Sequence, residues 1–162
     1  MKVLLAVLVS GTVTVAQAQA PSPASSRTMV SASDVAAMIA KAKAERKDQP
    51  NIAQSMIQLA PYNVSLEYRA SVGNAAVHET EAELFYVVDG AATLVTGGKL
   101  TNENRTNAQN LTGSGIEGGV TRRVAKGDFI MVPENTPHWF SAIDGTVVLM
   151  SLHLPHAPST AK

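Results

Sequence analysis

The stretch GDFIMVPENTPHWFSAIDG, residues 127–145, places two short apolar runs on either side of a turn. Pro133 and Pro137 bracket the turn, and both flanking runs have the composition of β-strands. His138 stands at the start of the second run, directly after the turn. An imidazole at that place either makes a hydrogen bond within the core or binds a metal ion. The choice between these roles depends on the partners that the rest of the chain supplies.

Composition narrows the choice of partners. The chain has 162 residues, a length that predicts one domain with a sizeable core. Its formal net charge is zero and it has no Lys/Arg-rich run, so nucleic acid is not an expected partner. Cysteine is absent, which excludes disulfides and thiolate metal sites. Any bound metal ion must therefore be held by His, Asp or Glu side chains.

Residues 1–20 have the pattern of a signal peptide, with one lysine, an apolar run at 3–15 and the small-residue segment VAQAQA. We expect cleavage after Ala18 or Ala20, and prefer Ala18 because a cut after Ala20 would leave a proline next to the scissile bond. The apolar run is shorter than the roughly 20 residues of a membrane span. The sequence therefore predicts a periplasmic or secreted protein with no membrane segment once the signal is removed.

Residues 21–50 are predicted to form a linker followed by one amphipathic helix. Ser31 and Asp34 have the spacing of a capping box, and Pro50 prevents the helix from continuing. Apolar residues recur at helical spacing: Val35, Met38, Ile39 and Ala42. The helix carries no reactive group, so we expect its apolar stripe to cover part of the core.

Residues 51–155 change to a period of two and contain many short strand-like runs separated by turn residues. This pattern predicts an all-β fold, a sandwich or barrel, with the helix outside it. The segment 99–119 is polar and Gly-rich, and we expect it to be a functional lid or an unstructured insertion. Residues 156–162 are predicted to be a flexible tail.

The stretch VHETEAELFYVVDG, residues 77–90, supplies candidate partners for His138. His78 ends one strand, and alternation in the next strand puts Glu83 and Phe85 on one face. A carboxylate among apolar side chains needs a cation or hydrogen bonds to offset its burial. Two imidazoles and one carboxylate form a ligand set suited to a divalent metal ion with open coordination positions.

These two stretches resemble the motifs of the cupin superfamily, in particular its small, single-domain, exported bacterial members. The first cupin motif is G-x5-HxH-x3–4-E-x6-G, and the second is G-x5-PxG-x2-H-x3-N. The matching residues are His78, Glu83 and Gly90 in the first motif, and Gly127, Pro133 and His138 in the second, with Asn135 in place of a glycine. The resemblance covers roughly residues 51–155 and implies a single jelly-roll barrel.

The chain departs from both motifs. Ala76 stands where the first motif has its first histidine, and Ala142 stands where the second motif has its asparagine. Cupins that bind a metal ion with four side chains use that missing histidine. This chain offers three of the four ligands: His78, Glu83 and His138. His153, in the last strand-like run, is a candidate fourth ligand that the motifs do not support.

The resemblance implies one divalent metal ion (Fe, Mn, Zn or Ni) and a small polar metabolite as substrate. Lyase, isomerase or dioxygenase chemistry would follow, in a homodimer paired through the segment SMIQLA. The departures at Ala76 and Ala142 leave an alternative open, a non-catalytic cupin that binds a sugar or small acid without metal. A scaffold with a filled interior is the third alternative.

Aromatic and basic residues are candidates for lining the barrel. Tyr68, Phe85 and Phe140 are expected to line its interior or pack in its core. Three arginines could bind an anionic substrate at its mouth: Arg69, Arg122 and Arg123. Because the last two are neighbours on one strand, they point to opposite sides.

Overall fold

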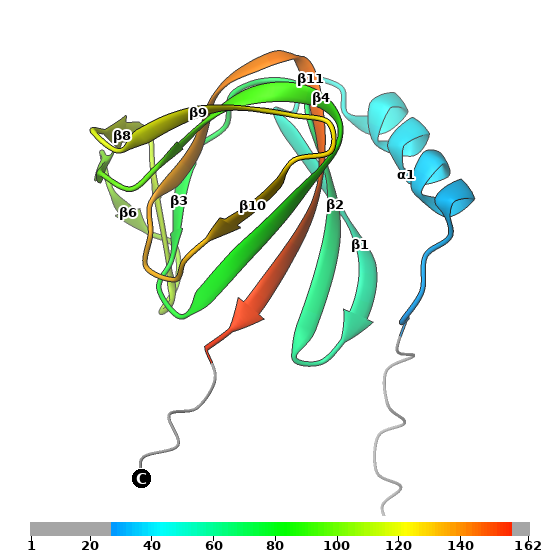
Figure 1. Cartoon of the computed structure of the whole chain (residues 1–162), viewed down its shortest axis with the longest axis horizontal. Helices are drawn as coiled ribbons and strands as arrows, with labels where there is room; N and C mark the ends of the chain where they lie inside the picture. The colour runs from blue at the N-terminus through cyan, green and yellow to red at the C-terminus, as the bar shows by residue number, and fades with distance from the viewer. Residues whose placement is uncertain (1–26, 157–162) are drawn as a thin grey trace, which may run out of the picture.

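The computed structural model describes residues 27–156 as one helix lying outside a β-barrel (Figure 1). The elements in chain order are α1 (Ala32–Glu45), β1 (Asn51–Leu59), β2 (Tyr62–Arg69), β3 (Ala75–His78), β4 (Glu81–Thr96), β5 (Lys99–Thr101), β6 (Asn104–Arg105), β7 (Asn110–Gly113), β8 (Gly115–Glu117), β9 (Val120–Ala125), β10 (Phe129–Val132) and β11 (His138–Pro155). The prediction of an all-β fold with one N-terminal helix is confirmed.

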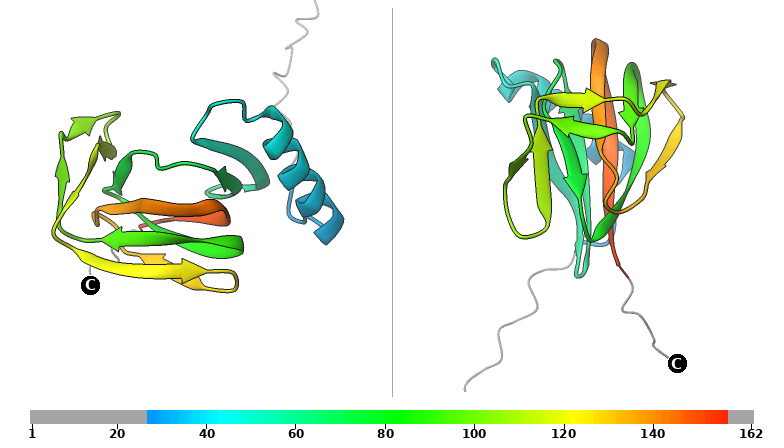
Figure 2. Two further views of the ribbon diagram at one scale, coloured as in Figure 1. Left: turned by 90° about the horizontal axis from the view of Figure 1, so that it is seen from above. Right: turned by 90° about the vertical axis from the view of Figure 1, so that its left-hand side faces the viewer.

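The helix begins where the capping box predicts. The Ser31 side chain accepts a hydrogen bond from the Asp34 backbone N–H, and the Asp34 carboxylate accepts one from the Ser31 backbone N–H. Two otherwise unpaired backbone donors of the first turn are satisfied in this way. The apolar stripe of α1 packs on the outer surface of the barrel, next to the β1–β2 hairpin (Figure 2).

Two long strands, β4 and β11, hold the barrel together because each pairs with the other in both of its walls. We call the wall β1–β2–β11–β4–β10 the first wall and the wall β9–β4–β11–β3–β7–β6 the second wall. Each long strand joins two runs that the sequence suggested were separate strands, ELFYVVDG with AATLVTGG and HWFSA with TVVLMSLHLP. The two strands change wall at a shared bend.

Gly90 occupies that bend in β4, opposite the irregular segment of β11 between Ile143 and Val147. Its φ of +77° lies in the left-handed region that favours glycine. A Cβ atom at this position would lie 2.0 Å from the carbonyl oxygen of Thr146. The bend therefore needs glycine both for its backbone conformation and for the close approach of β11.

The segment 99–119 differs from what the sequence predicted. It is not an unstructured insertion, because it contains four short strands, whereas the expected role as a functional lid stays a prediction. β5 pairs with β8 in a small separate sheet, while β7 pairs with both β3 and β6 and so extends the second wall. These four strands have only two to four residues each and too few apolar positions for the alternation of a β-strand to be visible in the sequence.

Two separate clusters of buried apolar residues result. The interior cluster lies between the walls and contains Phe85, Val87, Ala92, Leu94, Val124, Val132, Phe140, Val147 and Leu149. The outer cluster lies between the first wall and α1 and contains Ala42, Met56, Leu66, Tyr68 and Val148. The prediction that Tyr68 lines the barrel interior is therefore wrong. The first wall carries apolar residues on both of its faces, and α1 covers the face from which Tyr68 projects.

Among residues 27–156, no helix is long and apolar enough to cross a membrane. The predicted signal peptide at 1–20 lies outside the described residues, as does most of the predicted tail. Both stay predictions.

Candidate metal centre

Glu83 is the buried carboxylate around which the site is built. It pairs directly with His153 across β4 and β11. Residues paired in this way project from the same face of a sheet, so both side chains enter the barrel. Ser151 projects from that face two residues earlier, and its hydroxyl donates a 2.5 Å hydrogen bond to Glu83 Oε1. The Glu83 side chain is only 4% exposed.

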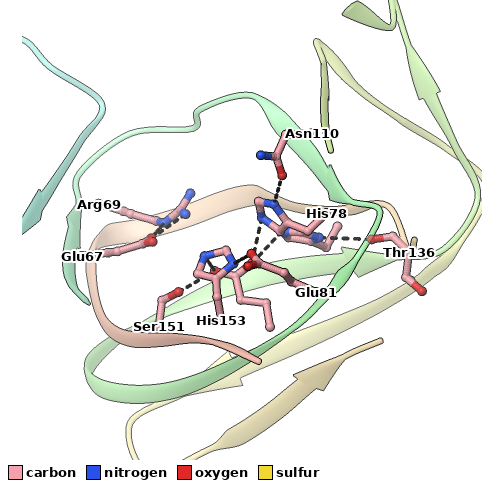
Figure 3. A network of polar contacts seen from close by, with 10 residues as sticks. Glu67, Arg69, His78, Glu81, Asn110, Thr136, Ser151 and His153 are labelled. Carbon is pink, nitrogen blue, oxygen red and sulfur yellow. Dashed lines mark hydrogen bonds and ion pairs between the residues drawn. The ribbon is translucent and has the colours of Figure 1, made fainter. Parts of the chain in front are cut away.

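Two further imidazoles reach the same carboxylate from the ends of their strands. His78 is the last residue of β3, and its Nε2 lies 3.4 Å from Glu83 Oε2. His138 is the first residue of β11, and its Nε2 lies 3.0 Å from the same oxygen. The Nε2 atom of His153 lies 3.4 Å from Glu83 Oε1. Figure 3 shows the rings of His78 and His153 close together inside the barrel.

The structure thus brings together all four residues that the sequence singled out. One ligand atom each from His78, Glu83 and His153 lies within 4.8 Å of the other two, a spacing that could hold one metal ion. His138 stands outside this mutually close group but makes the shortest imidazole contact to Glu83. His153, expected only as a candidate fourth ligand, therefore belongs to the tightest group. Which of the four residues bind a metal ion stays a prediction.

The hydrogen bonds of His78 define which of its ring nitrogens is free. His78 Nδ1 lies 2.6 Å from Asn110 Oδ1, an atom that can only accept, so Nδ1 carries the proton. The Asn110 amide is held in this orientation because its Nδ2 donates to Asn107 Oδ1. Asn107 Oδ1 also accepts from the backbone N–H of Gln109, which cannot reverse its role. In its neutral form, the imidazole of His78 therefore carries its proton on Nδ1 and presents an unprotonated Nε2 to Glu83.

The other two imidazoles are also held from their outer sides. His138 Nδ1 donates to the backbone carbonyl of Thr136 at 3.2 Å, because a carbonyl can only accept. Its Nε2 is free for the same reason as that of His78. His153 Nδ1 lies 3.1 Å from Glu81 Oε2, but without the alignment of a hydrogen bond. Each ring thus has its Nδ1 near an acceptor and its Nε2 near Glu83, an arrangement common among metal-binding histidines.

The electrostatics of the site favour positive charge at its centre. Burial by itself raises the pKa of the Glu83 carboxyl, but His138, His78 and the Ser151 hydroxyl outweigh it, and the pKa falls well below its usual range. Burial lowers the pKa of the His78 imidazole, but its contacts with Glu83 and Asn110 outweigh this effect and raise that pKa. The lowered pKa of Glu83 means that its carboxylate stays ionised and attracts a cation. The raised pKa of His78 reflects the same attraction between positive charge and this carboxylate.

The residues present fit a divalent metal ion. Glu83 Oε2 is buried and has no hydrogen-bond partner within residues 27–156, although two Nε2 atoms lie near it. A carboxylate oxygen facing unprotonated imidazole nitrogens is repelled unless a proton or a metal ion lies between them. Three imidazoles and one carboxylate make a nitrogen-rich set that suits Zn, Fe or Ni.

The missing histidine of the first motif has a clear position in the fold. Ala76 pairs with His138 across β3 and β11 in the second wall, whereas His153 pairs with Glu83 in the first wall. An imidazole from His153 would thus reach the centre from a different wall than a histidine at position 76. The predicted lining residues Phe85 and Phe140 lie beside the site, with the Phe85 ring centroid 6.0 Å from that of His138.

Sequence reasoning missed the residues that support the ligands. Ser151 alternates with His153 along one strand, so its direction was readable once that strand was placed in the barrel. Asn110 gave no signal, because it lies in the polar segment 99–119 and meets His78 only through the pairing of β3 with β7. Glu81 is the first residue of β4, and its carboxylate contacts His153.

Comparison with known proteins places this geometry in a family. The family model described as Cupin matches residues 43–160, which include every residue of the candidate centre. A search of curated proteins finds no match. Solved structures were found that share the fold at low sequence identity.

KdgF from Halomonas sp. is 18% identical, with 68% of this chain and 84% of that chain covered and a TM-score of 0.49. FeII HppE is 15% identical, with 65% of this chain and 51% of that chain covered and a TM-score of 0.50. Streptomyces PAC13, in a structure with uridine, is 15% identical, with 69% and 75% covered and a TM-score of 0.47. At these identities the likeness concerns the fold alone.

Proposed function

We propose, from the premise that this chain belongs to the cupin family, that it binds one divalent metal ion and acts on a small polar metabolite. The ligands in this proposal are the Nε2 atoms of His78, His138 and His153 and the carboxylate of Glu83. The ion would be Fe, Mn, Zn or Ni, and the reaction a lyase, isomerase or dioxygenase reaction.

One observation carries the proposal. Three imidazoles direct Nε2 toward one buried carboxylate, and one oxygen of that carboxylate has no hydrogen-bond partner within the described residues. A core histidine that is merely satisfied would donate to a partner and leave no such oxygen. Because His78 and His138 use Nδ1 to donate to Asn110 and Thr136, the neutral form of each ring carries its lone pair on Nε2, where a metal ion could accept it.

A bound divalent ion would supply Lewis acidity, polarising a substrate hydroxyl or carboxylate. The chain itself would orient the ligands and shape the site. The Ser151 hydroxyl fixes Glu83 through Oε1 and leaves Oε2 directed at the imidazoles. Phe85 and Phe140 form an edge-to-face pair on the side of His138 and keep water away from that flank.

Metal analysis of protein purified without added ions, followed by reconstitution with Zn²⁺, Mn²⁺, Fe²⁺ and Ni²⁺, tests the proposal. We expect close to one ion per chain and a rise in melting temperature, since a ligand that binds only the folded state stabilises it. His138→Ala and His153→Ala should each weaken this stabilisation. His156→Ala is the matched control, because that exposed histidine pairs with Glu134 outside the centre.

Two outcomes would contradict the metal proposal. One is a metal content far below one per chain that reconstitution does not restore. The other is stabilisation by sugars or small acids while all four metal ions have no effect, which would support the non-catalytic alternative.

Export and dimerisation are further proposals. The signal segment is the support for export, and β1 is the support for a homodimer. β1 pairs with β2 on one side, and on its other side the described residues make only an isolated bridge between Gln58 and Arg27. A second copy could add to that edge. Sedimentation of the mature chain would test this, and a monomer at high concentration would contradict it.

A further inference from the structure

We propose that Arg69 anchors a carboxylate group of the substrate, so that the site acts on a small organic acid carrying one carboxylate. This inference rests on the proposed function, because it assigns the substrate class of the same barrel. It begins from a buried Arg69–Glu67 pair to which the metal centre gives no role.

The register of β2 places this pair inside the barrel. Glu67 pairs with Leu149 and Arg69 pairs with Val147, and both partners belong to the interior cluster. Glu67 and Arg69 therefore project from the interior face. The side chains of Glu67 and Arg69 are only 11% and 17% exposed, respectively. Figure 3 shows both side chains in the same interior view as His78 and His153.

The Arg69–Glu67 pair lies on β2, further along the barrel than the metal centre. Ser65, two residues before Glu67, pairs with Ser151, whose hydroxyl is bonded to Glu83. Two residues of a β-strand span about 7 Å. Glu67 thus lies about 7 Å and Arg69, four residues after Ser65, about 13 Å along β2 from the level of Ser151. A ligand of several carbon atoms bound near Glu83 would extend along the interior face toward the Arg69 guanidinium.

The guanidinium of Arg69 is only partly used by the protein. Its Nε and Nη2 both contact Glu67 Oε2, at 2.7 and 2.5 Å. A guanidinium has five N–H donors, and no other hydrogen bond or ion pair of Arg69 is found within residues 27–156. The three remaining donors include both N–H groups of Nη1. No Arg69 nitrogen is among the fully buried side-chain atoms without a partner in the described residues, so these donors are accessible and a ligand with acceptor oxygens could bind them.

Packing holds the guanidinium in place for such a ligand. Its central carbon lies 4.8 Å from the centroid of the Phe140 ring, a cation–π contact. Phe140 in turn packs edge-on against Phe85, which neighbours His138. With Nε and one Nη2 donor on Glu67, the end formed by Nη1 and Nη2 is free, and this end matches the two oxygens of a carboxylate.

Charge favours a carboxylate over a phosphate group. Arg69 and Glu67 together are neutral, and a divalent ion with Glu83 would leave one net positive charge among the innermost groups. The partly exposed Glu81 carboxylate beside His153 adds negative charge at the edge of the centre, which further disfavours a doubly charged ligand. One carboxylate neutralises that charge, whereas a phosphate group at neutral pH carries about −1.5 to −2 and overshoots it. The other two candidate arginines lie on β9 with exposed side chains: Arg123 pairs with Asp144, and Arg122 donates to Thr96 Oγ1.

The test is a binding titration of the Zn²⁺-loaded protein and of the metal-free protein. The probes are hydroxy and keto monocarboxylates of two to six carbons, their neutral amides, and methyl phosphate. We expect at least one monocarboxylate to bind at least about tenfold more tightly than its amide and than methyl phosphate. Arg69→Lys keeps the positive charge but loses the pair of N–H donors that can bind both oxygens of a carboxylate. It should weaken that binding about 10- to 100-fold with Zn²⁺ affinity unchanged.

The Glu67→Gln variant distinguishes an arginine that binds a ligand from one that only forms a structural ion pair. Removing the neutralising carboxylate should strengthen monocarboxylate binding, whereas a structural pair predicts no gain. Because this variant leaves a buried cation, Glu67→Gln/Arg69→Gln is the neutral companion, and it should lose carboxylate binding. Arg123→Gln is the matched control and should change nothing, because that exposed arginine projects from the opposite face of β9 to Val124 and pairs with Asp144.

The inference is overturned if no monocarboxylate binds better than its amide, or if Arg69→Lys binds the acid as tightly as the natural chain. Its failure is distinguishable from failure of the metal proposal, since Zn²⁺ affinity is measured separately in every variant. Arg69-dependent carboxylate binding in a chain that takes up no metal would support the anchor and reject the metal centre.

Discussion

The two halves of the first wall's interior face are made by the same two strands and differ in chemistry. At one end of the β4–β11 pairing Glu83 faces His153, and further along Val87 faces Leu149. Val87 and Leu149 are fully buried in an apolar cluster, while Glu83 lies among imidazoles. Strand alternation decides only that these side chains point inward. Residue type then decides whether a position stabilises the fold or forms a site.

Burial of side chains stabilises the fold in the apolar half and opposes folding in the polar half. Burying apolar surface contributes about 25 cal/mol per Å² to stability. Burying the Glu83 carboxylate is unfavourable unless hydrogen bonds and positive charge compensate it. The fold can bear the polar half because the apolar half and the outer cluster under α1 supply the stability. Substitutions in the two halves should therefore separate stability from binding.

Glu83→Gln should have the largest effect, and it should appear in metal binding. The amide is similar in size but has no charge and one acceptor fewer, so the imidazoles lose the carboxylate on which they converge. We expect metal affinity to fall by more than the about 100-fold that losing an outer-shell partner produces. Isothermal titration with Zn²⁺ measures this, with the exposed Glu117→Gln as control. Affinity within tenfold of the natural chain would remove Glu83 from the ligand set.

Leu149→Ala should show the reverse pattern in the apolar half. The side chain is fully buried in the interior cluster, and truncation of such a leucine lowers the free energy of unfolding by about 2–5 kcal/mol. Metal affinity of the folded protein should stay within a few-fold. Urea unfolding of the metal-free chain gives the first quantity and titration the second. A loss below 1 kcal/mol would mean that the interior cluster does not support the barrel.

The comparison also explains what could be predicted from the sequence. Alternation in β4 correctly placed Glu83 and Phe85 on one face, and Ser31 with Asp34 correctly marked the start of the helix. These features depend on neighbours within a few residues. The family motifs located His78 and His138 at strand ends because their spacing from turn residues is local too.

What failed depended on contacts between distant segments. His153 faces Glu83 only because of the register between β4 and β11, which shifts by a residue between Val148 and Leu149. Tyr68 lies beneath α1 and not inside the barrel, because an apolar face of a strand can either turn inward or be covered by a helix. The role of Asn110 required the pairing of β3 with a four-residue polar strand.

Metal affinity should fall steeply with acidity. The pKa of His78 is raised, so in the metal-free chain this ring holds a proton to a higher pH than an ordinary histidine, and a metal ion must displace it. Each displaced proton changes the apparent affinity about tenfold per pH unit below that pKa. Between pH 7.5 and 5.5 we expect the apparent affinity to fall, approaching tenfold per pH unit once the pH is below that pKa, as measured by titration. A flat profile would contradict ligation by His78.

The stability of the metal-free chain should respond to His78 in the opposite direction. A raised pKa in the folded state means that protonation of His78 stabilises the fold at pH values below its unfolded pKa. That contribution is lost as the pH rises through the folded value. Glu83, with a lowered pKa, contributes above its unfolded value and loses this contribution as the pH falls toward its folded value. Thermal unfolding of His78→Gln across this range should lack the first contribution.

Asn110→Ala should have the smallest of these effects, because Asn110 acts on the metal only through His78. Its Oδ1 holds the proton on His78 Nδ1, and without it the ring can move that proton to Nε2, where it blocks the lone pair. We expect metal affinity to fall about tenfold. Asn110→Asp keeps an acceptor and should restore it, while Asn104→Ala, on the exposed β6 strand, is the matched control. Nitrogen-15 NMR of His78 reports the tautomer directly, and a ring still protonated on Nδ1 in Asn110→Ala would show that this amide does not set the tautomer of His78.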